Sequence, residues 1–316
     1  DSMLETRVTR SFDLAEGVSI NPERYPVCLT FFNSEYMLYT DVLFKLSRQA
    51  ASRLDMRIAS AFAMKELGFY TEEEYKSQLT MVTPYGLASL NRNAEPDTVL
   101  TAKICAADPD ITDKKSVTEV MYNILDDKES DAEDVSSAYL ALASYGEPVL
   151  TEIISLLETS ADSLEQTDGL RLTAALALLG DNASAEKYYA VFASEITETK
   201  DDEGNISISV NGEYPVEATQ TAIMTAAVLG LPEADGMARY LVNTRQVYDS
   251  FALELMVYLK HYTPEKAADA SFSYTLDGET VKVDLDRHFG THLEFGKEQL
   301  EKADKMLEKY PNLYGD

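Results

Sequence analysis

A recurring pattern of paired helical segments constrains this chain more than any other feature of its sequence. From residue 54 onward, a strongly apolar segment ends at a small residue, a short turn follows, and an amphipathic segment comes next. The turns fall at Gly68, Ala107, Gly146, Gly180 and Gly230. The first three are evenly spaced, the fourth follows after a slightly shorter interval, and the long last interval shortens to match it when the stretch near 200–215 is treated as an insertion. A period of roughly 34–39 residues is typical of stacked helical hairpins.

The two kinds of segment predict two layers of helices. Helices that are apolar nearly all round are buried on every side, so the apolar segments are expected to lie inside. They are Leu54–Leu67, Thr98–Ala106, Ser136–Tyr145, Leu170–Leu179, Ala218–Leu229 and Phe251–His261. Their one-faced partners are Glu72–Met81, Asp113–Leu125, Pro148–Leu157, Ala183–Ala193 and Pro232–Val242. We therefore predict a mainly α fold, an α/α toroid of about six helical hairpins, with an open solenoid as the alternative.

The toroid is expected to occupy residues 36–270, with small β additions on either side. Residues 1–35 contain β-prone runs and are interpreted as a β-rich N-terminal segment of a flanking module. Residues 34–45 are ambiguous between helix and loop. Residues 271–316 are expected to hold a β-hairpin and a C-terminal helix over about Leu293–Lys309.

Two β-hairpins are predicted from two-residue turn signals, which match the twist of paired strands. The first lies in the insertion near 200–215, where Ile206–Val210 is expected to turn on Asn211-Gly212. The second is expected to turn on Asp277-Gly278, in the C-terminal part.

The charge balance excludes two classes of partner. The chain has 27 basic and 55 acidic residues, a net charge of −28. Nucleic acids and anionic membrane surfaces are bound through Lys and Arg, so neither is an expected partner. No run of about 18 apolar residues occurs, so we expect no membrane insertion by this segment. The cysteines, Cys28 and Cys105, are interpreted either as a disulfide or as two buried thiols, because their spacing does not decide.

Two candidate metal sites are weak. His288 and His292 lack a clear third ligand. The run Asp108–Asp113 followed by Glu119 has the spacing of a calcium loop, but Asp113 stands where that loop requires glycine. A helix start capped by Thr112 or Asp113 explains the run better. We therefore expect no metal and no cofactor.

Residues 46–53 carry the first of two patches with a known likeness. Gln49-Ala50-Ala51-Ser52-Arg53, followed by an apolar helix, resembles the thioester region of bacterial alpha-2-macroglobulin-like proteins. In that family a Cys-x-Glu-Gln tetrad closes an internal thioester between the Cys and Gln side chains. Residues three apart on a helical turn face each other, which explains the spacing.

The four tetrad positions of this chain are Leu46, Ser47, Arg48 and Gln49. Leucine replaces the cysteine and arginine replaces the glutamate, so only the glutamine matches. Because leucine has no thiol, we predict a degenerate site that forms no thioester. The stretch from Leu46 to Arg53 is expected to open the first strongly apolar helix.

A second patch follows in the same order as in that family. Pro84-Tyr85-Gly86-Leu87-Ala88-Ser89-Leu90 resembles its Gly-rich loop, and Asp97-Thr98-Val99-Leu100-Thr101-Ala102-Lys103 resembles its Leu-Thr-Ala helix start. The family's tryptophan is absent from this patch. Only these two patches match in residues, although the predicted architecture covers most of the chain.

The resemblance implies a function without catalysis. It implies a thioester-domain-like module, covalently part of a longer bacterial extracellular or cell-surface protein, with proteases or surface proteins as partners. Protease trapping or surface defence would then be conformational rather than covalent, and no catalytic residue is expected. One alternative is a toroid enzyme or binding module for glycans. The 19 tyrosines could line a sugar-binding groove, but the chain has no tryptophan. Another is a structural spacer in a surface protein.

Overall fold

The protein is described from a computed structural model. The structure describes residues 27–31, 37–48, 53–79, 83, 86–194, 196–200, 204–210, 215–243, 251–261, 271–276, 279–284 and 291–296. The chain divides into two compact units: Glu35–Glu265 is one, and Asp1–Ser34 with Lys266–Asp316 is the other. Each unit is described by itself.

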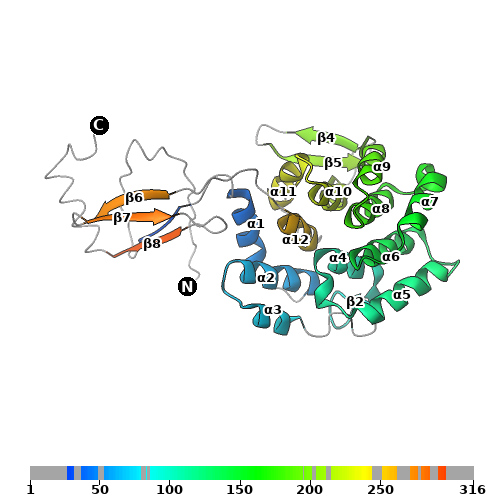
Figure 1. The fold of residues 1–316 in the computed structure, drawn as a ribbon, viewed down its shortest axis with the longest axis horizontal. Helices are drawn as coiled ribbons and strands as arrows, with labels where there is room; N and C mark the ends of the chain where they lie inside the picture. The colour runs from blue at the N-terminus through cyan, green and yellow to red at the C-terminus, as the bar shows by residue number, and fades with distance from the viewer. Residues whose placement is uncertain are drawn as a thin grey trace. The chain divides into compact units, whose positions relative to one another are not determined.

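The unit of Glu35–Glu265 consists mainly of α-helices (Figure 1). They are α1 (Met37–Ser47), α2 (Leu54–Glu66), α3 (Glu72–Gln78), α4 (Thr98–Ala107), α5 (Lys114–Asp126), α6 (Ala132–Ser144), α7 (Leu150–Ser160), α8 (Gln166–Leu178), α9 (Asn182–Ser194), α10 (Pro215–Leu229), α11 (Glu233–Asn243) and α12 (Ala252–His261). Short 3-10 turns cover Pro109–Ile111 and Ala161–Ser163. The prediction of a mainly α fold is confirmed, and α1 resolves the ambiguity of residues 34–45 in favour of helix for its own span.

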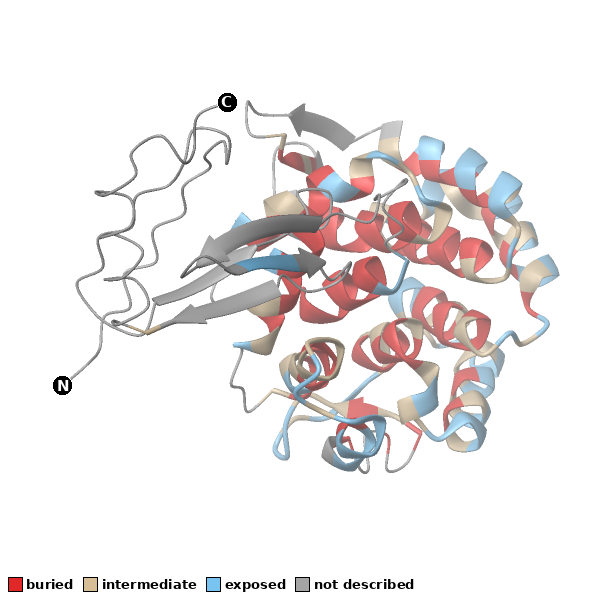
Figure 2. Cartoon of the chain, turned by 60° about the vertical axis from the view of Figure 1, so that its left-hand side comes forward, coloured by how far each residue is buried: buried red, intermediate tan, exposed pale blue. Residues whose placement is uncertain are grey.

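Burial separates the helices into the two predicted layers. Residues 251–259 are all buried, as are residues 168–177 of α8. The outer helix α5 buries only Val117 and Met121, and α7 buries only Ile153 and Leu157. In each of these helices the two buried residues lie about one turn apart, so they form a single apolar stripe that faces the core. Figure 2 shows the same contrast between buried inner helices and exposed outer faces.

The inner helices contact one another in sequence and close on themselves. Helix α4 packs on α6, α6 on α8, α8 on α10 and α10 on α12, while α12 packs on both α4 and α2. We call α4, α6, α8, α10 and α12 the helix ring. Predicted ends at Gly68, Gly146, Gly180 and Gly230 are confirmed, because these glycines take positive φ values of 67–84° just after a helix.

Polar contacts show that most ring helices run parallel. Lys103 of α4 pairs with Glu254 near the start of α12, and Asp108 after the end of α4 pairs with Lys260 near the end of α12. Glu133 and Arg171 pair the first halves of α6 and α8. The Cys105 thiol, near the end of α4, donates to the hydroxyl of Tyr145 just after α6. The first turns of α4, α6, α8 and α12 therefore lie at one end of the ring.

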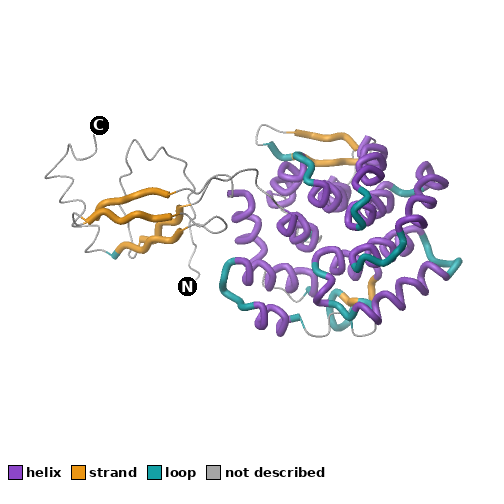
Figure 3. The backbone as a smooth tube through the Cα atoms, in the orientation of Figure 1, coloured by secondary structure: helices purple, strands orange, loops and turns teal. Residues whose placement is uncertain are grey.

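The strands of the described residues form two-stranded pairs (Figure 3). In the helical unit, β2 (Ala88–Ser89) pairs with β3 (Pro96–Asp97), and β4 (Ile196–Lys200) pairs with β5 (Ile206–Val210). In the other unit, β1 (Val27–Phe31) pairs with β8 (Thr291–Phe295), and β6 (Ser271–Leu276) pairs with β7 (Glu279–Asp284). Among the described residues, no helix is long and apolar enough to cross a membrane.

Two details of the β prediction are wrong. Strand β5 pairs with the preceding β4, so its hairpin does not turn on Asn211-Gly212; the chain after that signal forms α10 instead of a strand. Leu293 belongs to β8 and pairs with Leu29, so no helix begins there. The rest of the predicted C-terminal helix and residues 1–26 of the predicted β-rich N-terminal segment lie outside the described residues. The pairing of Leu276 with Glu279 confirms the two-residue connection at 277–278.

Candidate functional site

The predicted site falls at the end of α1 rather than at the start of α2. Leu46 and Ser47 form the last residues of α1, and Arg48 follows it with an exposed side chain. Gln49 lies outside the described residues. The prediction that this stretch opens the apolar helix is therefore wrong for its first three positions, because Leu46 completes an apolar stripe that begins on α1.

Leu46 is a core residue. Its side chain is 0% exposed, as are those of Val42 and Leu43, which precede it by about one helical turn. This spacing directs all three side chains to one face of α1. Helix α1 packs on α2, α11 and α12. Position 46 thus carries hydrocarbon that stabilises the packing and has no nucleophilic atom.

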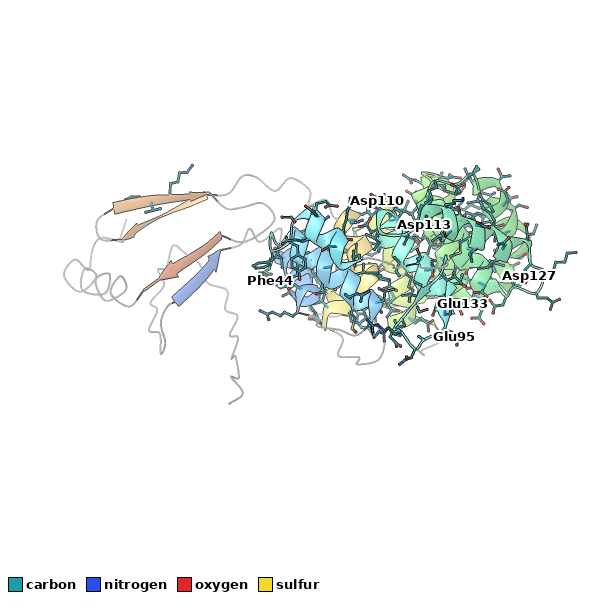
Figure 4. The ribbon with its side chains drawn as sticks, turned by 90° about the horizontal axis from the view of Figure 1, so that it is seen from below. Phe44, Glu95, Asp110, Asp113, Asp127 and Glu133 are labelled. Carbon is teal, nitrogen blue, oxygen red and sulfur yellow. The ribbon has the colours of Figure 1, made fainter. Side chains whose placement is uncertain are left out.

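Ser47 has a local structural role. Its hydroxyl donates to the carbonyl oxygen of Phe44 at 2.9 Å, and its own carbonyl accepts from the hydroxyl of Ser60 on α2 at 3.3 Å. Figure 4 labels Phe44 on this helix. The first hydrogen bond closes the last turn of α1 and the second joins that turn to α2. Both groups of Ser47 therefore stabilise the junction between these two helices.

The two sequence patches meet at the start of α2. The backbone N–H of Leu54 donates to the carbonyl of Leu90 at 2.8 Å, which joins the end of the first patch to the end of the Gly-rich loop. The guanidinium of Arg53 reaches both carboxylate oxygens of Asp55, at 3.2 and 2.9 Å. Asp55 is buried and also accepts from the backbone of Met56. The residues that suggested the family are therefore neighbours in space at this junction.

Gly86 lets the second patch lie against α5. Its φ is +87°, and a Cβ atom there would lie 2.5 Å from Val120 and 2.6 Å from the carbonyl oxygen of Ser116. The backbone of Ala88 then donates to the hydroxyl of Thr101 at 2.8 Å. The Asp97 side chain caps α4 by accepting from Leu100 at 2.7 Å. Pro84 and Tyr85 lie outside the described residues.

Cys105 is not a reactive thiol. It is free, wholly buried in α4, and burial raises its pKa to about 11. Its thiol donates to the Tyr145 hydroxyl, which also shares a hydrogen bond with Thr112. A thiol with this pKa stays protonated at neutral pH and is unreactive, since the thiolate is the nucleophile.

The weak metal candidates have other structural roles. Asp108 accepts from the Tyr75 hydroxyl at 2.7 Å and pairs with Lys260 at 3.3 Å. Asp113 precedes α5 as predicted, but its carboxylate accepts from the Ser116 hydroxyl instead of a backbone cap donor. His292 lies in β8 opposite Thr30, while His288 is outside the described residues. Within the described part of the chain, no group of three or more His, Cys, Asp or Glu side chains is placed to hold a metal ion.

A largely buried polar cluster between α6 and α8 was missed by the sequence analysis. Arg171 pairs with Asp168 at 2.7 Å and with Glu133 at 2.9 Å, and the Ser136 hydroxyl donates to Asp168 at 3.0 Å. Burial raises the pKa of Asp168, while Arg171 and Ser136 oppose this rise. Figure 4 labels Glu133, whose exposed carboxylate links the cluster to solvent.

A second buried ion pair lies where the ring closes. Lys103 pairs with Glu254 at 2.7 Å, and the Glu254 side chain is 1% exposed. The pair joins α4 to α12, so the first and last helices of the ring share a buried charge contact.

Comparison with known proteins gives structural relatives only. No family model and no curated protein matches the chain. The structure is similar to native alpha-2-macroglobulin from Escherichia coli spanning domain MG7 to the C-terminus, with a TM-score of 0.51 and 14% identity over 87% of this chain and 49% of that one. It is also similar to Salmonella alpha-2-macroglobulin, both reacted with methylamine and as a point mutant, with TM-scores of 0.53 and 14% identity over 92% of this chain and 21% of each of those.

The chain therefore spans about half the length of the Escherichia coli structure and about a fifth of the Salmonella ones. At 14% identity, the similarity establishes a shared fold. By its fold, the chain is similar to a part of the bacterial alpha-2-macroglobulins.

Proposed function

We propose that this chain is the helical module of a bacterial extracellular alpha-2-macroglobulin-like protein that contributes to protease capture without forming a covalent bond. Two independent features support the proposal. The fold is similar to parts of two bacterial alpha-2-macroglobulins, and the patches that resemble the family's thioester region are joined by the Leu54–Leu90 backbone bond.

The environment of Leu46 is the observation that supports capture without a covalent bond. A thioester needs a thiol at this position, and the position holds a wholly buried leucine. The buried thiol of Cys105 stays protonated at neutral pH. Capture would then depend on enclosure of the protease by the longer protein, and this module would act as a packed, non-catalytic part of it.

Methylamine tests the lost thioester directly. The protein is incubated with methylamine, then thiols are counted in denaturant and the intact mass is measured. We expect an unchanged thiol count and no added methylamine. The Cys105→Ser variant is the control that shows one cysteine is detected with full sensitivity. A new thiol together with the mass of one methylamine would overturn the non-covalent proposal.

Protease capture is tested on the longer parent protein. A captured protease would keep its activity on a small peptide and lose activity on a large protein substrate, because enclosure blocks only large molecules. No covalent adduct should survive denaturing electrophoresis. Equal activity on both substrates would reject capture and favour the structural spacer.

A further inference from the structure

The ring helices present one equivalent interior position in successive repeats. Lys103, Ser137 and Arg171 are evenly spaced along the sequence, and each is the sixth residue of its helix, α4, α6 and α8. Glu254, on the first turn of α12, joins this level through its 2.7 Å contact with Lys103. We call these four residues the polar belt.

The direction of the belt side chains follows from the contacts of the residues that lie two positions before them in the sequence. Thr101 bonds to Ala88 of β2, in the outer connection before α4, and Gly169 lies against Phe192 of the outer helix α9. Side chains two positions apart on a helix are separated by about 200° around its axis. Lys103 and Arg171 therefore point away from the outer layer, into the ring, and Ser137 holds the equivalent position between them.

The geometry of a five-helix ring brings such side chains together. Helices pack with about 8–10 Å between axes, which puts each axis of a regular five-membered ring within about 7–9 Å of its centre. Side chains at one level that point inward therefore converge. Because α4, α6, α8 and α12 begin at the same end of the ring, the belt residues share such a level.

Three belt residues carry buried polar atoms without partners. Ser137, Arg171 and Glu254 are 0%, 3% and 1% exposed. Among the described residues, the Ser137 hydroxyl, the Arg171 Nε and the Glu254 Oε2 have no hydrogen-bond partner. Buried polar groups without partners are costly, so their occurrence at belt positions of three ring helices points to a molecule that completes the bonding.

The charges of the polar belt indicate whether the bound molecule would be charged or neutral. Arg171 is paired with the buried Asp168, while its other partner Glu133 is exposed to solvent, and Lys103 is paired with Glu254. A charged ligand would leave one buried charge without compensation. The remaining groups are one donor at Arg171, one acceptor at Glu254 and one hydroxyl at Ser137 that does both. Hydroxyl groups both donate and accept, so neighbouring hydroxyls of a single neutral molecule match all three.

We propose that the polar belt binds a small uncharged polyol, no larger than a monosaccharide, inside the helix ring. The side chain of Lys103 is 21% exposed, so the belt is in contact with solvent on the α4 side. Binding here is a function separate from protease capture, because it does not involve the end of α1, and only Lys103, the last residue of the second patch, belongs to the belt.

The test is saturation-transfer-difference NMR on the full chain with glycerol, D-glucose and D-galactose as separate probes. We expect saturation transfer to at least one probe. Ser137→Ala removes one hydroxyl from the belt and should weaken that binding by about tenfold, the effect of one hydrogen bond. Ser144→Ala is the matched control on the same helix, since the Ser144 hydroxyl donates to the Leu140 carbonyl and its loss should leave binding unchanged.

A second variant separates binding from folding. Glu254→Gln keeps the shape of the side chain and removes its charge, so we expect lost polyol binding with the helical circular dichroism retained. The absence of saturation transfer from all three probes would mean that the belt holds only water, and would overturn the proposal. Equal binding by wild type and Ser137→Ala would also overturn it, by placing the polyol elsewhere.

Discussion

At the scale of single residues, Leu46 and Gly86 each determine one feature of the candidate site. Leu46 places buried hydrocarbon at the end of α1, and Gly86 permits a backbone approach to α5 that a side chain would prevent. The two positions differ in kind: Leu46 contributes an apolar side chain to the core, whereas Gly86 fulfils a steric requirement.

At the residue scale, Gly86→Ala is expected to destabilise the protein by about 2–4 kcal/mol. The new methyl group would overlap Val120 and the Ser116 carbonyl, and overpacking costs about 1–3 kcal/mol, with about 1 kcal/mol more for the left-handed backbone. Urea unfolding measures the change. Gly68→Ala is the control, because Gly68 has a φ of +76° with no atom within 4 Å of the new Cβ, so only the backbone cost remains. Equal losses in both variants would contradict the close approach to α5.

At the element scale, the closure of the ring depends on contacts between its first and last helices. The Tyr75 hydroxyl on α3 donates to Asp108 after α4, and Lys260 on α12 pairs with the same carboxylate. Lys260 also lies over the Phe62 ring of α2, at 5.9 Å from its centroid. One buried carboxylate thus links α3, α4 and α12 where the ring closes, and Lys260 extends this contact to α2.

Tyr75→Phe is therefore expected to cost about 1–2 kcal/mol, because it deprives a buried carboxylate of a hydrogen-bond donor. Thermal unfolding followed by circular dichroism gives the loss. The control is Tyr122→Phe, whose exposed hydroxyl donates to Glu147 at a long 3.4 Å and should contribute less than about 0.5 kcal/mol. A Tyr75→Phe variant as stable as this control would show that the closure does not depend on the hydroxyl.

The helices were predictable from sequence because their signals are local. Apolar runs and glycine ends identified all six inner helices, and one-faced patterns identified the five outer ones. Helix α1 was ambiguous because its apolar residues serve a core built by distant helices, α11 and α12. Strand β8 was missed for a related reason: Leu293 pairs with Leu29, near the opposite end of the sequence, and no local pattern specifies such a partner.

The candidate site was predictable only in part. The leucine at position 46 is visible in the sequence, but its burial at the end of α1 depends on packing. The polar belt was overlooked because a lysine, a serine and an arginine share no chemical type. Their spacing equals the interval between the turns at Gly146 and Gly180, so aligning the repeats by position would have revealed it.

At the scale of the whole molecule, the helical unit has a core of its own. Buried apolar side chains of the described residues extend from Leu38 to Leu259, within the unit of Glu35–Glu265. A chain segment with its own hydrophobic core is expected to fold independently. The other unit contains both ends of the sequence, so its β1–β8 pair joins segments that the helical unit separates in the chain.

A protein of residues 35–265 alone is therefore expected to unfold cooperatively, with a Tm within about 5 °C of the helical transition of the full chain. Calorimetry of both proteins tests this. The complementary comparison is a chain that ends at residue 243 and lacks α12, which should lose the cooperative transition because the ring cannot close. A fragment of 35–265 that does not unfold cooperatively would show that the helical unit depends on the other one.

The register of the polar belt has a practical consequence for protein engineering. Positions 103, 137 and 171 recur at a fixed interval along the sequence, and position 254 contacts the first of them, so a combinatorial library limited to these four positions would vary the inward-facing polar groups while the outer scaffold stayed constant. Sensors or carriers for different small solutes could then be selected from a single backbone.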